Sequence, residues 1–242
     1  MIRIKKTPEV LWLFGILFVS LGVAICSKAD LGVSMIAAPA FVVQEALAPL
    51  GSFFSVGAVE YLIQALLLLV MCLAVRRFNW RYLPAFFVAV IYGYVLDLIL
   101  FLMRDLSFDS AAVRWGMLLL GDLITSFGVA CFFHTYLPLQ VHELFVAEIA
   151  RCRKKNIHKV KWIFDLSLLA LSLLLAFTLF GDAGEFDWSK IGYTSFHNIG
   201  LGTIVTTFIN SPIIAFFSKG IEKICDPAPL FPRFEKIMKR AQ

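Results

Sequence analysis

The chain has 242 residues, of which 60% are hydrophobic and only 16% are charged. A water-soluble domain carries more charge and less apolar surface, so this composition excludes that class. The formal net charge of +5 does not indicate a nucleic-acid partner, because the basic residues lie in short loops between apolar runs and not on one polar face.

Six apolar runs follow one another along the chain, each about 19 to 23 residues long and able to cross roughly 30 Å of hydrocarbon as a helix. The first run follows a basic start and resembles a signal peptide, but it is longer than the apolar region of such peptides, about 7 to 15 residues. The runs predict an all-α polytopic membrane protein whose main partner is the lipid bilayer. The predicted transmembrane helices are residues 9–27, 54–75, 82–103, 113–134, 162–180 and 199–217.

The positions of lysine and arginine predict the orientation of the chain. If the N-terminus is cytoplasmic, the outer loops hold only four of the 22 basic residues, namely Lys28, Arg104, Arg114 and Lys190. Membrane proteins keep an excess of positive charge on the cytoplasmic side. We therefore predict a multi-pass protein of the bacterial plasma (inner) membrane with both termini in the cytoplasm.

Two segments between the spans are too short to cross a bilayer. Residues 35–50 contain Pro39 and Pro49 and follow the first span, and residues 137–150 follow the fourth. Non-helical or broken backbone at membrane depth occurs where it is buried in protein or lines a water-filled path. We predict a half-helix or re-entrant element in each segment, one on the outer side and one on the inner side.

The chain matches itself at an offset of 106 residues. The most specific matches are Gly15 with Gly121, Ser20 with Ser126, and the Gly-Val-Ala triplets at 22–24 and 128–130. With three crossings in each half, the second copy is inverted relative to the first, as in many secondary transporters. The alternative is that two packing faces rich in small residues resemble each other.

This 3+3 inverted repeat, with a broken or re-entrant element in each half, divides the chain into three parts. The first membrane repeat covers residues 1–112 and the second covers residues 113–217. A basic cytoplasmic tail covers residues 218–242.

Two short motifs carry a resemblance to a known family. They are ADLGVS at residues 29–34, after the first span, and GTI at residues 202–204, in the last span. In these motifs and over most of its length the chain resembles the YczE/YyaS/YitT family of bacterial integral membrane proteins. Many relatives would have Gly-Pro late in the last helix, where this chain has Ser211-Pro212. The resemblance implies a membrane protein and adds little about its chemistry.

Ionisable side chains inside a span cost several kcal/mol unless they are paired or hydrated, so by default they mark functional sites. Asp122 lies near the middle of the fourth span and is the first candidate, because its counterpart in the repeat is the apolar Ile16. The other candidates lie toward the outer ends of their spans: Asp97, Glu60, Gln64, Lys28 and Asp30. Together they predict an outward-facing polar vestibule in which a carboxylate binds a cation or a proton. The alternative is that they pair between helices as structural contacts.

The last span carries a polar stripe at helical spacing, formed by Thr203, Thr206, Thr207 and Asn210. Such a face points to a pore or to a neighbouring helix, and Pro212 frees a backbone carbonyl one turn earlier. The stripe is a candidate for the substrate path, with helix packing as the alternative. Asp165 lies beside a lysine cluster near the inner end of the fifth span, where we expect a surface ion pair.

His134, His142 and Glu143 lie around the inner end of the fourth span but lack the spacing of metal ligands. The five cysteines lack C-x-x-C or Cys/His spacing. The sequence contains no phosphate-binding loop, nucleophile elbow or zinc-protease motif. We predict no metal, no cofactor and no enzymatic activity.

Two hypotheses for function remain from the sequence. The first is a secondary transporter or permease for an unidentified small molecule, indicated by the repeat, the broken elements and Asp122. The alternative is a membrane-embedded accessory or regulatory protein that acts through protein–protein contacts, for example at the basic loop of residues 151–161. A second copy of the chain is an open partner in either case.

Overall fold

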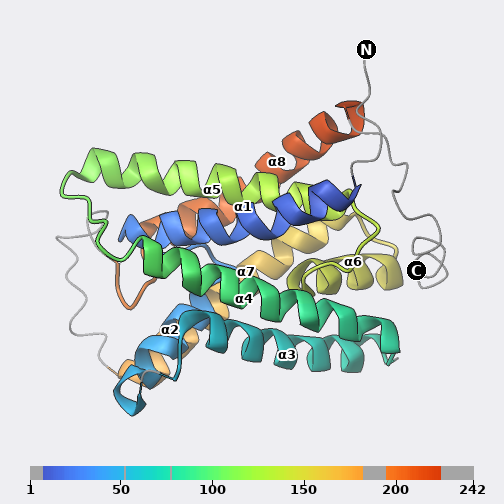
Figure 1. Cartoon of the computed structure of the whole chain (residues 1–242). Helices are drawn as coiled ribbons and strands as arrows, with labels where there is room; N and C mark the ends of the chain where they lie inside the picture. Colours follow the sequence, from blue (N-terminus) through green and yellow to red (C-terminus); the bar gives the residue numbers. More distant parts are fainter. Residues whose placement is uncertain (1–7, 52, 77, 182–194, 225–242) are drawn as a thin grey trace.

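The computed structural model describes residues 8–51, 53–76, 78–181 and 195–224. Within these residues six helices are long and apolar enough to cross a membrane, which confirms the predicted all-α polytopic class (Figure 1). They are α1 (Pro8–Lys28), α3 (Val56–Val75), α4 (Leu83–Leu102), α5 (Ala111–Phe133), α7 (Ile157–Phe180) and α8 (Leu201–Ile224). Lys190, the residues before Pro8 and most of the predicted tail, 225–242, lie outside the described residues.

The helix ends differ from the predicted spans where polar residues continue a helix beyond the apolar run. α7 begins at Ile157 rather than 162, because the side chain of Asn156 accepts a hydrogen bond from the backbone N–H of His158 at 2.9 Å and caps the helix. α8 extends to Ile224 rather than 217. Hydropathy marks where a helix can meet lipid, whereas capping and backbone hydrogen bonds decide where it ends.

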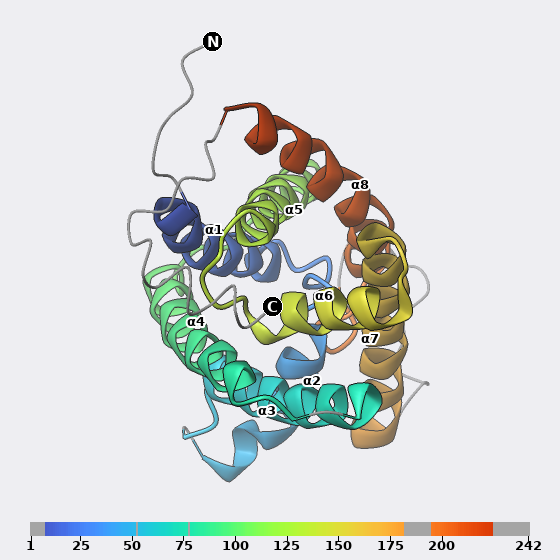
Figure 2. The same cartoon turned by 90° about the vertical axis from the view of Figure 1, so that its right-hand side faces the viewer.

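Both predicted intervening segments contain short helices. α2 (Ala38–Leu47) continues into the 3₁₀ turn η1 (Ala48–Leu50), and α6 (Val141–Arg153) precedes α7. Each short helix packs against both α3 and α7, and Figure 2 shows α6 inside the ring formed by the long helices, with α2 running past α3. α6 lies at the end of the bundle where α1 begins and α8 ends, and α2 lies toward the opposite end (Figure 1). A further 3₁₀ turn, η2 (Trp80–Tyr82), leads into α4.

The helix contacts of the two halves correspond to one another. α1 packs along α5; α4 packs against α1 and α3, and α8 packs against α5 and α7. The short helices follow the same rule, because α2 contacts α3 and α7 while α6 contacts α7 and α3. Exchanging the first four α-helices with the last four returns these contacts, whereas the contacts of α6 with α4 and α5 have no counterpart of that extent at α2.

Glycines permit close backbone contact where α1 crosses α5. A Cβ atom on Gly22 would lie 2.5 Å from the carbonyl oxygen of Gly121, and one on Gly128 would lie 3.1 Å from that of Gly15. Real Cβ atoms avoid such distances from backbone oxygen, so the two helices approach this closely only because these residues are glycines.

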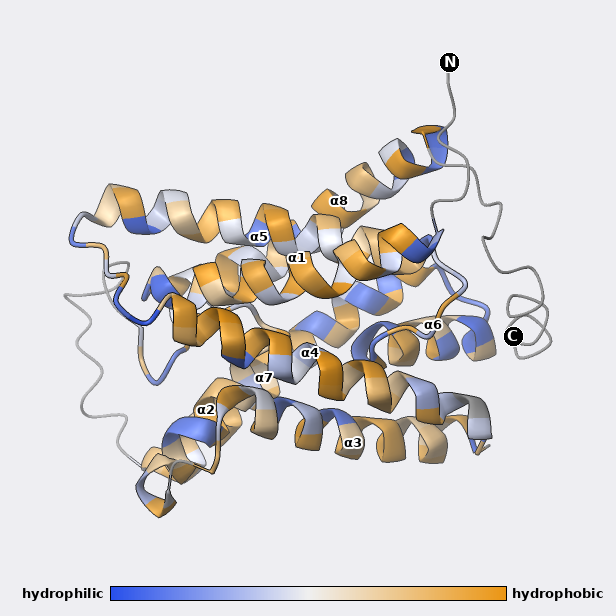
Figure 3. Ribbon diagram, viewed as in Figure 1, coloured by the Kyte–Doolittle hydropathy of each residue, from blue (hydrophilic) through white to orange (hydrophobic). Residues whose placement is uncertain are grey.

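Large apolar residues lie exposed on the spans and many polar residues are buried; Figure 3 shows hydrophobic residues along the long helices with hydrophilic ones interspersed. Large apolar residues such as Leu66, Leu73 and Phe87 are more than half exposed on the spans, whereas Asp122 and Asp165 have an exposed fraction of 0%. This distribution of polar and apolar residues is the opposite of that in a water-soluble protein, and it is suited to a lipid environment. The chain is therefore a multi-pass membrane protein.

Candidate functional site

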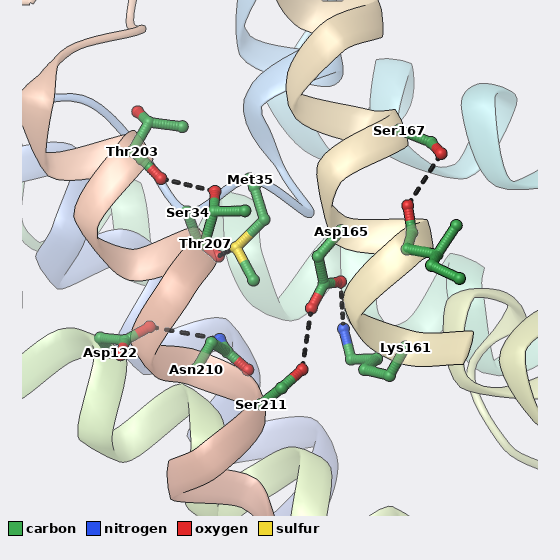
Figure 4. A network of polar contacts seen from close by, with 11 residues as sticks. Ser34, Met35, Asp122, Lys161, Asp165, Ser167, Thr203, Thr207, Asn210 and Ser211 are labelled. Carbon is green, nitrogen blue, oxygen red and sulfur yellow. Dashed lines mark hydrogen bonds and ion pairs between the residues drawn. The ribbon is translucent and has the colours of Figure 1, made fainter. Parts of the chain in front are cut away.

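Asp122 of α5 lies in the bundle interior beside α8. Asn210 Nδ2 donates a hydrogen bond to Asp122 Oδ1 at 3.2 Å (Figure 4). The second carboxyl oxygen of Asp122 and the amide oxygen of Asn210 have no hydrogen-bond partner within the described part of the chain. Both of these oxygen atoms can accept hydrogen bonds, so the pair has two buried acceptors without a donor.

A buried ion pair on α7 lies on the other side of α8. Lys161 Nζ contacts Asp165 Oδ1 at 2.6 Å, and Ser211 Oγ donates to Asp165 Oδ2 at 3.5 Å. The expected surface ion pair at Asp165 is wrong, because the side chains of Lys161 and Asp165 are only 2% and 0% exposed. A lysine one helical turn from an aspartate signals a pair, but the sequence around it does not show that α6 and α8 cover it.

Two consecutive residues of α8 connect these groups. Asn210 reaches Asp122 on α5, and Ser211 reaches Asp165 on α7. Figure 4 shows both contacts side by side. Pro212 follows directly within the helix, and its ring interrupts the regular backbone hydrogen bonding at this turn. The last span thus contacts two acidic side chains from different helices at the turn that contains Pro212.

The threonines of the predicted polar stripe are buried but mostly satisfied within their own helix. Thr206 and Thr207 donate to the backbone carbonyl of Thr203 at 3.1 and 2.7 Å. Thr203 Oγ1 accepts from the backbone N–H of Gly200 at 3.3 Å. Of the predicted stripe, Asn210 is therefore the member whose side-chain hydrogen bond joins α8 to another helix.

A second polar cluster lies between α3 and α6. Gln64 Nε2 donates to Glu60 Oε1 at 3.1 Å, and the backbone N–H of Val141 at the start of α6 donates to Gln64 Oε1 at 3.3 Å. His142 and Glu143 are both 1% exposed, and His142 Nδ1 is 3.9 Å from Glu60 Oε1. The structure thus brings Glu60 and Gln64 together with two residues that the sequence reasoning assigned no role.

The sequence signal for His142 and Glu143 was weak. α6 alternates apolar and charged residues, as a surface helix does, and only its insertion between α3 and α7 buries its first turn. An acidic residue in the first turn of a helix is also favoured by the helix dipole alone, without any functional role.

The two clusters are electrostatically linked. Glu143 interacts with Glu60, Lys161 and Asp165, and Asp122 interacts with Asp165 and Lys161. Burial raises the pKa of Glu143 to about 7, although the positive charge of Lys161 opposes the shift. Burial, together with Lys161, lowers the pKa of His142 to about 3, so its ring is neutral at pH 7. We name the linked set, Glu60, Asp122, His142, Glu143, Lys161 and Asp165, the interior charge cluster.

The remaining sequence-predicted candidates have partners at the end of the bundle where α1 ends and α5 begins. Asp97 accepts hydrogen bonds from the backbone N–H of Gly57 at 2.8 Å and from Ser55 Oγ at 2.6 Å, so it holds the start of α3. Lys28 donates to the carbonyl of Arg104 at 3.1 Å, and Asp30 pairs with Arg114 at 3.3 Å. These contacts join helix ends and loops, whereas the contacts of Asp122 run to α8.

No group of three or more His, Cys, Asp or Glu side chains in the described residues is arranged to hold a metal ion. Of the described cysteines, Cys26 and Cys131 are buried and Cys152 is exposed.

The fold and the interior charge cluster define a multi-pass helical membrane protein with a buried charged centre. Residues 6–219 match the model of a family described as a family of unknown function, DUF6198. The chain belongs to this family. No curated protein and no solved structure matches it. Membership of the YczE/YyaS/YitT family stays a prediction.

Proposed function

We propose that this protein is a secondary transporter that moves a small solute across the bacterial inner membrane. The interior charge cluster is the observation that carries the proposal. Burying ionisable groups in a bundle surrounded by lipid costs several kcal/mol, and such groups are typical of substrate and ion pathways. A protein that needed only a stable bundle would be better served by apolar side chains at these positions.

The proposed 3+3 inverted repeat supports this function. At the offset of 106 residues, Gly15 corresponds to Gly121 and Gly22 to Gly128. A two-fold relation between the halves requires that the contact of Gly15 with Gly128 be repeated as a contact of Gly22 with Gly121, and both contacts occur. Inverted repeats of this kind carry their substrate site at the interface of the halves, near the midplane.

The interior charge cluster lies at that interface. Glu60 comes from the proposed first repeat, and Asp122, Glu143, Lys161 and Asp165 come from the second. The short helices α2 and α6 lie between α3 and α7, one from each half. We infer that the free acceptors of Asp122 and Asn210 contact the solute, because an N–H or O–H group of a ligand would satisfy them.

The proposed orientation places the α6 end of the bundle in the cytoplasm. Exposed basic residues cluster there at the end of α6 and the start of α7, including Arg151, Arg153, Lys154 and Lys155. The outer end holds Lys28, Arg104 and Arg114, of which each is engaged with a neighbour. This asymmetry supports cytoplasmic N- and C-termini.

Transport in reconstituted vesicles tests the proposal. A panel of labelled amines, amino acids and organic acids is offered to vesicles with wild-type protein and to vesicles with Asp122→Asn. We expect uptake of at least one solute by wild type and a loss of about tenfold or more in the variant, which corresponds to about 1.4 kcal/mol of lost interaction.

Asp105→Asn is the matched control. Asp105 is paired with Arg104 at the outer end and its side chain is 88% exposed, so this substitution should leave uptake unchanged. Wild-type vesicles that move none of the panel, or equal uptake with and without the Asp122 carboxylate, would count against a transporter and favour the accessory-protein alternative.

A further inference from the structure

The interior charge cluster contains more acid than base. Glu60, Asp122, Glu143 and Asp165 are all buried, and Lys161 is the buried lysine among them. Lys161 is already paired with Asp165 at 2.6 Å. The other three carboxyl groups have no lysine or arginine partner in the described residues, and His142 is neutral. Lys161 offsets the charges of Asp122 and Glu143 only in part, so ionising all three carboxyl groups together in a medium of low dielectric constant is too costly.

The unsatisfied atoms concentrate between α3 and α6. Glu60 Oε2, Glu143 Oε2 and both ring nitrogens of His142 have no hydrogen-bond partner in the described part of the chain, although all three residues are 1% exposed. A carboxylate without a donor is costly when buried, but a protonated carboxyl group removes the charge and supplies a donor to a neighbouring acceptor. His142 Nδ1, 3.9 Å from Glu60 Oε1, is such a neighbour after a small movement.

We propose that Glu60, His142 and Glu143 form a proton-binding site, and that the proton is the coupling ion of the transporter. The second half of this statement rests on the proposed function, whereas the first half does not. A proton is a small ligand that a site without a prepared set of metal-binding oxygens can hold on one carboxyl group. Its binding and release change the net charge of the cluster, which is what coupling to a solute requires.

The groups that face Glu143 come from each helix packed against α6. They are Glu60 from α3, Tyr92 from α4, and Lys161 and Asp165 from α7; Asp122 from α5 joins through Lys161 and Asp165. Burial favours the protonated form of Glu143, Lys161 favours the ionised form, and Asp165 adds a smaller preference for the protonated form. The balance leaves the pKa of Glu143 at about 7, so the proton exchanges at cytoplasmic pH.

Infrared spectroscopy of the purified protein in detergent micelles tests the site without any solute. The carbonyl stretching band of a protonated carboxyl group is recorded as the pH is raised from about 5 to about 9, a range that brackets the expected pKa. We expect carboxyl bands in wild type, one of which disappears with a midpoint near pH 7 and is missing from the spectrum of Glu143→Gln. No titrating carboxyl band that depends on Glu143 overturns the proposal.

Two further variants separate the site from a general loss of structure. Glu148→Gln changes a carboxylate on the same helix that is paired with Arg151, and it should leave the band and its midpoint unchanged. Lys161→Met removes the positive charge that lowers the pKa of Glu143, so the midpoint of the titration should move to higher pH. A band lost in Glu148→Gln, or a midpoint that moves to lower pH in Lys161→Met, contradicts the assignment.

The result is distinguishable from failure of the proposed function. If Glu143 titrates but the protein moves no solute, the proton-binding site is supported and the transporter function is contradicted. If a sodium gradient drives solute uptake and no carboxyl band titrates, the proton-binding site is contradicted and the transporter function is supported. Uptake that responds to a pH gradient in wild type but not in Glu143→Gln supports both.

Discussion

His142 and Glu143 are neighbours in the chain, and burial moves their pKa values in opposite directions. Glu143 is protonated in the fold over the range from about 4.5 to about 7, where the unfolded chain would ionise it, so its contribution to stability falls as the pH rises through that range. His142 is neutral in the fold from about 3 to 6.5, where the unfolded chain would be protonated, so its contribution rises with pH. The two effects partly cancel in the wild-type protein.

A single substitution separates these effects. Glu143→Gln removes the contribution of Glu143, which falls as the pH rises, and keeps that of His142, which increases. Thermal stability in detergent micelles should therefore rise with pH between about 4.5 and about 6.5 more steeply than in wild type. Melting temperatures measured at several pH values in that interval check this. Parallel curves for the two proteins would contradict the opposing pKa shifts, and Glu148→Gln should follow the wild-type curve.

Asp122 shows how far sequence reasoning reaches at the residue scale. Its position inside an apolar run made it a candidate, and the structure places it in the interior with an unsatisfied oxygen. The burial of Lys161 and Glu143 was not predictable, because a polar residue near a helix end looks the same whether it meets water or a neighbouring helix. Only the packing of α6 between α3 and α7, which local sequence does not encode, decides between these cases.

The contacts between elements depend on glycine at a few crossings. α3 and α4 meet at Gly57 and Gly93, where a Cβ atom on Gly57 would lie 2.1 Å from the carbonyl oxygen of Gly93. The backbone N–H of Gly57 also donates to Asp97 at 2.8 Å, so any displacement of α3 breaks this hydrogen bond as well.

Gly57→Ala should therefore destabilise the protein, by about 1 to 3 kcal/mol as is typical of overpacked sites. Gly116→Ala in α5 is the matched control, since a Cβ atom there meets nothing within 4 Å and alanine favours a helix over glycine. Thermal unfolding in detergent micelles compares the two. Equal melting temperatures for the two variants would mean that the α3 and α4 crossing is looser than described.

Element positions were predictable because an apolar run of membrane-spanning length rarely forms anything but a helix across the bilayer. The helix ends were less predictable. α7 starts after the capping residue Asn156, and α8 continues through Pro212 into a polar last turn. These features depend on backbone hydrogen bonds, which do not change the hydropathy of a segment.

At the scale of the whole molecule, the proposed orientation can be measured at two exposed positions. Cys152 at the end of α6 is exposed, and Ser107 lies exposed in the loop between α4 and α5 at the opposite end. In a background without Cys72 and Cys225, a membrane-impermeant thiol reagent should label Ser107→Cys on intact cells. The same reagent should label Cys152 only after the cells are permeabilised, and the reverse pattern would invert the orientation.

The glycine contacts between α1 and α5 limit how the rest of the bundle can move. Helices whose backbones touch at two levels cannot slide or separate without losing the whole seam at once. In the proposed transporter, α1 and α5 would therefore be the fixed pair, and the other helices would have to turn about it. Under the proposed inverted repeat, a rotation that opened one end of the bundle would close the other.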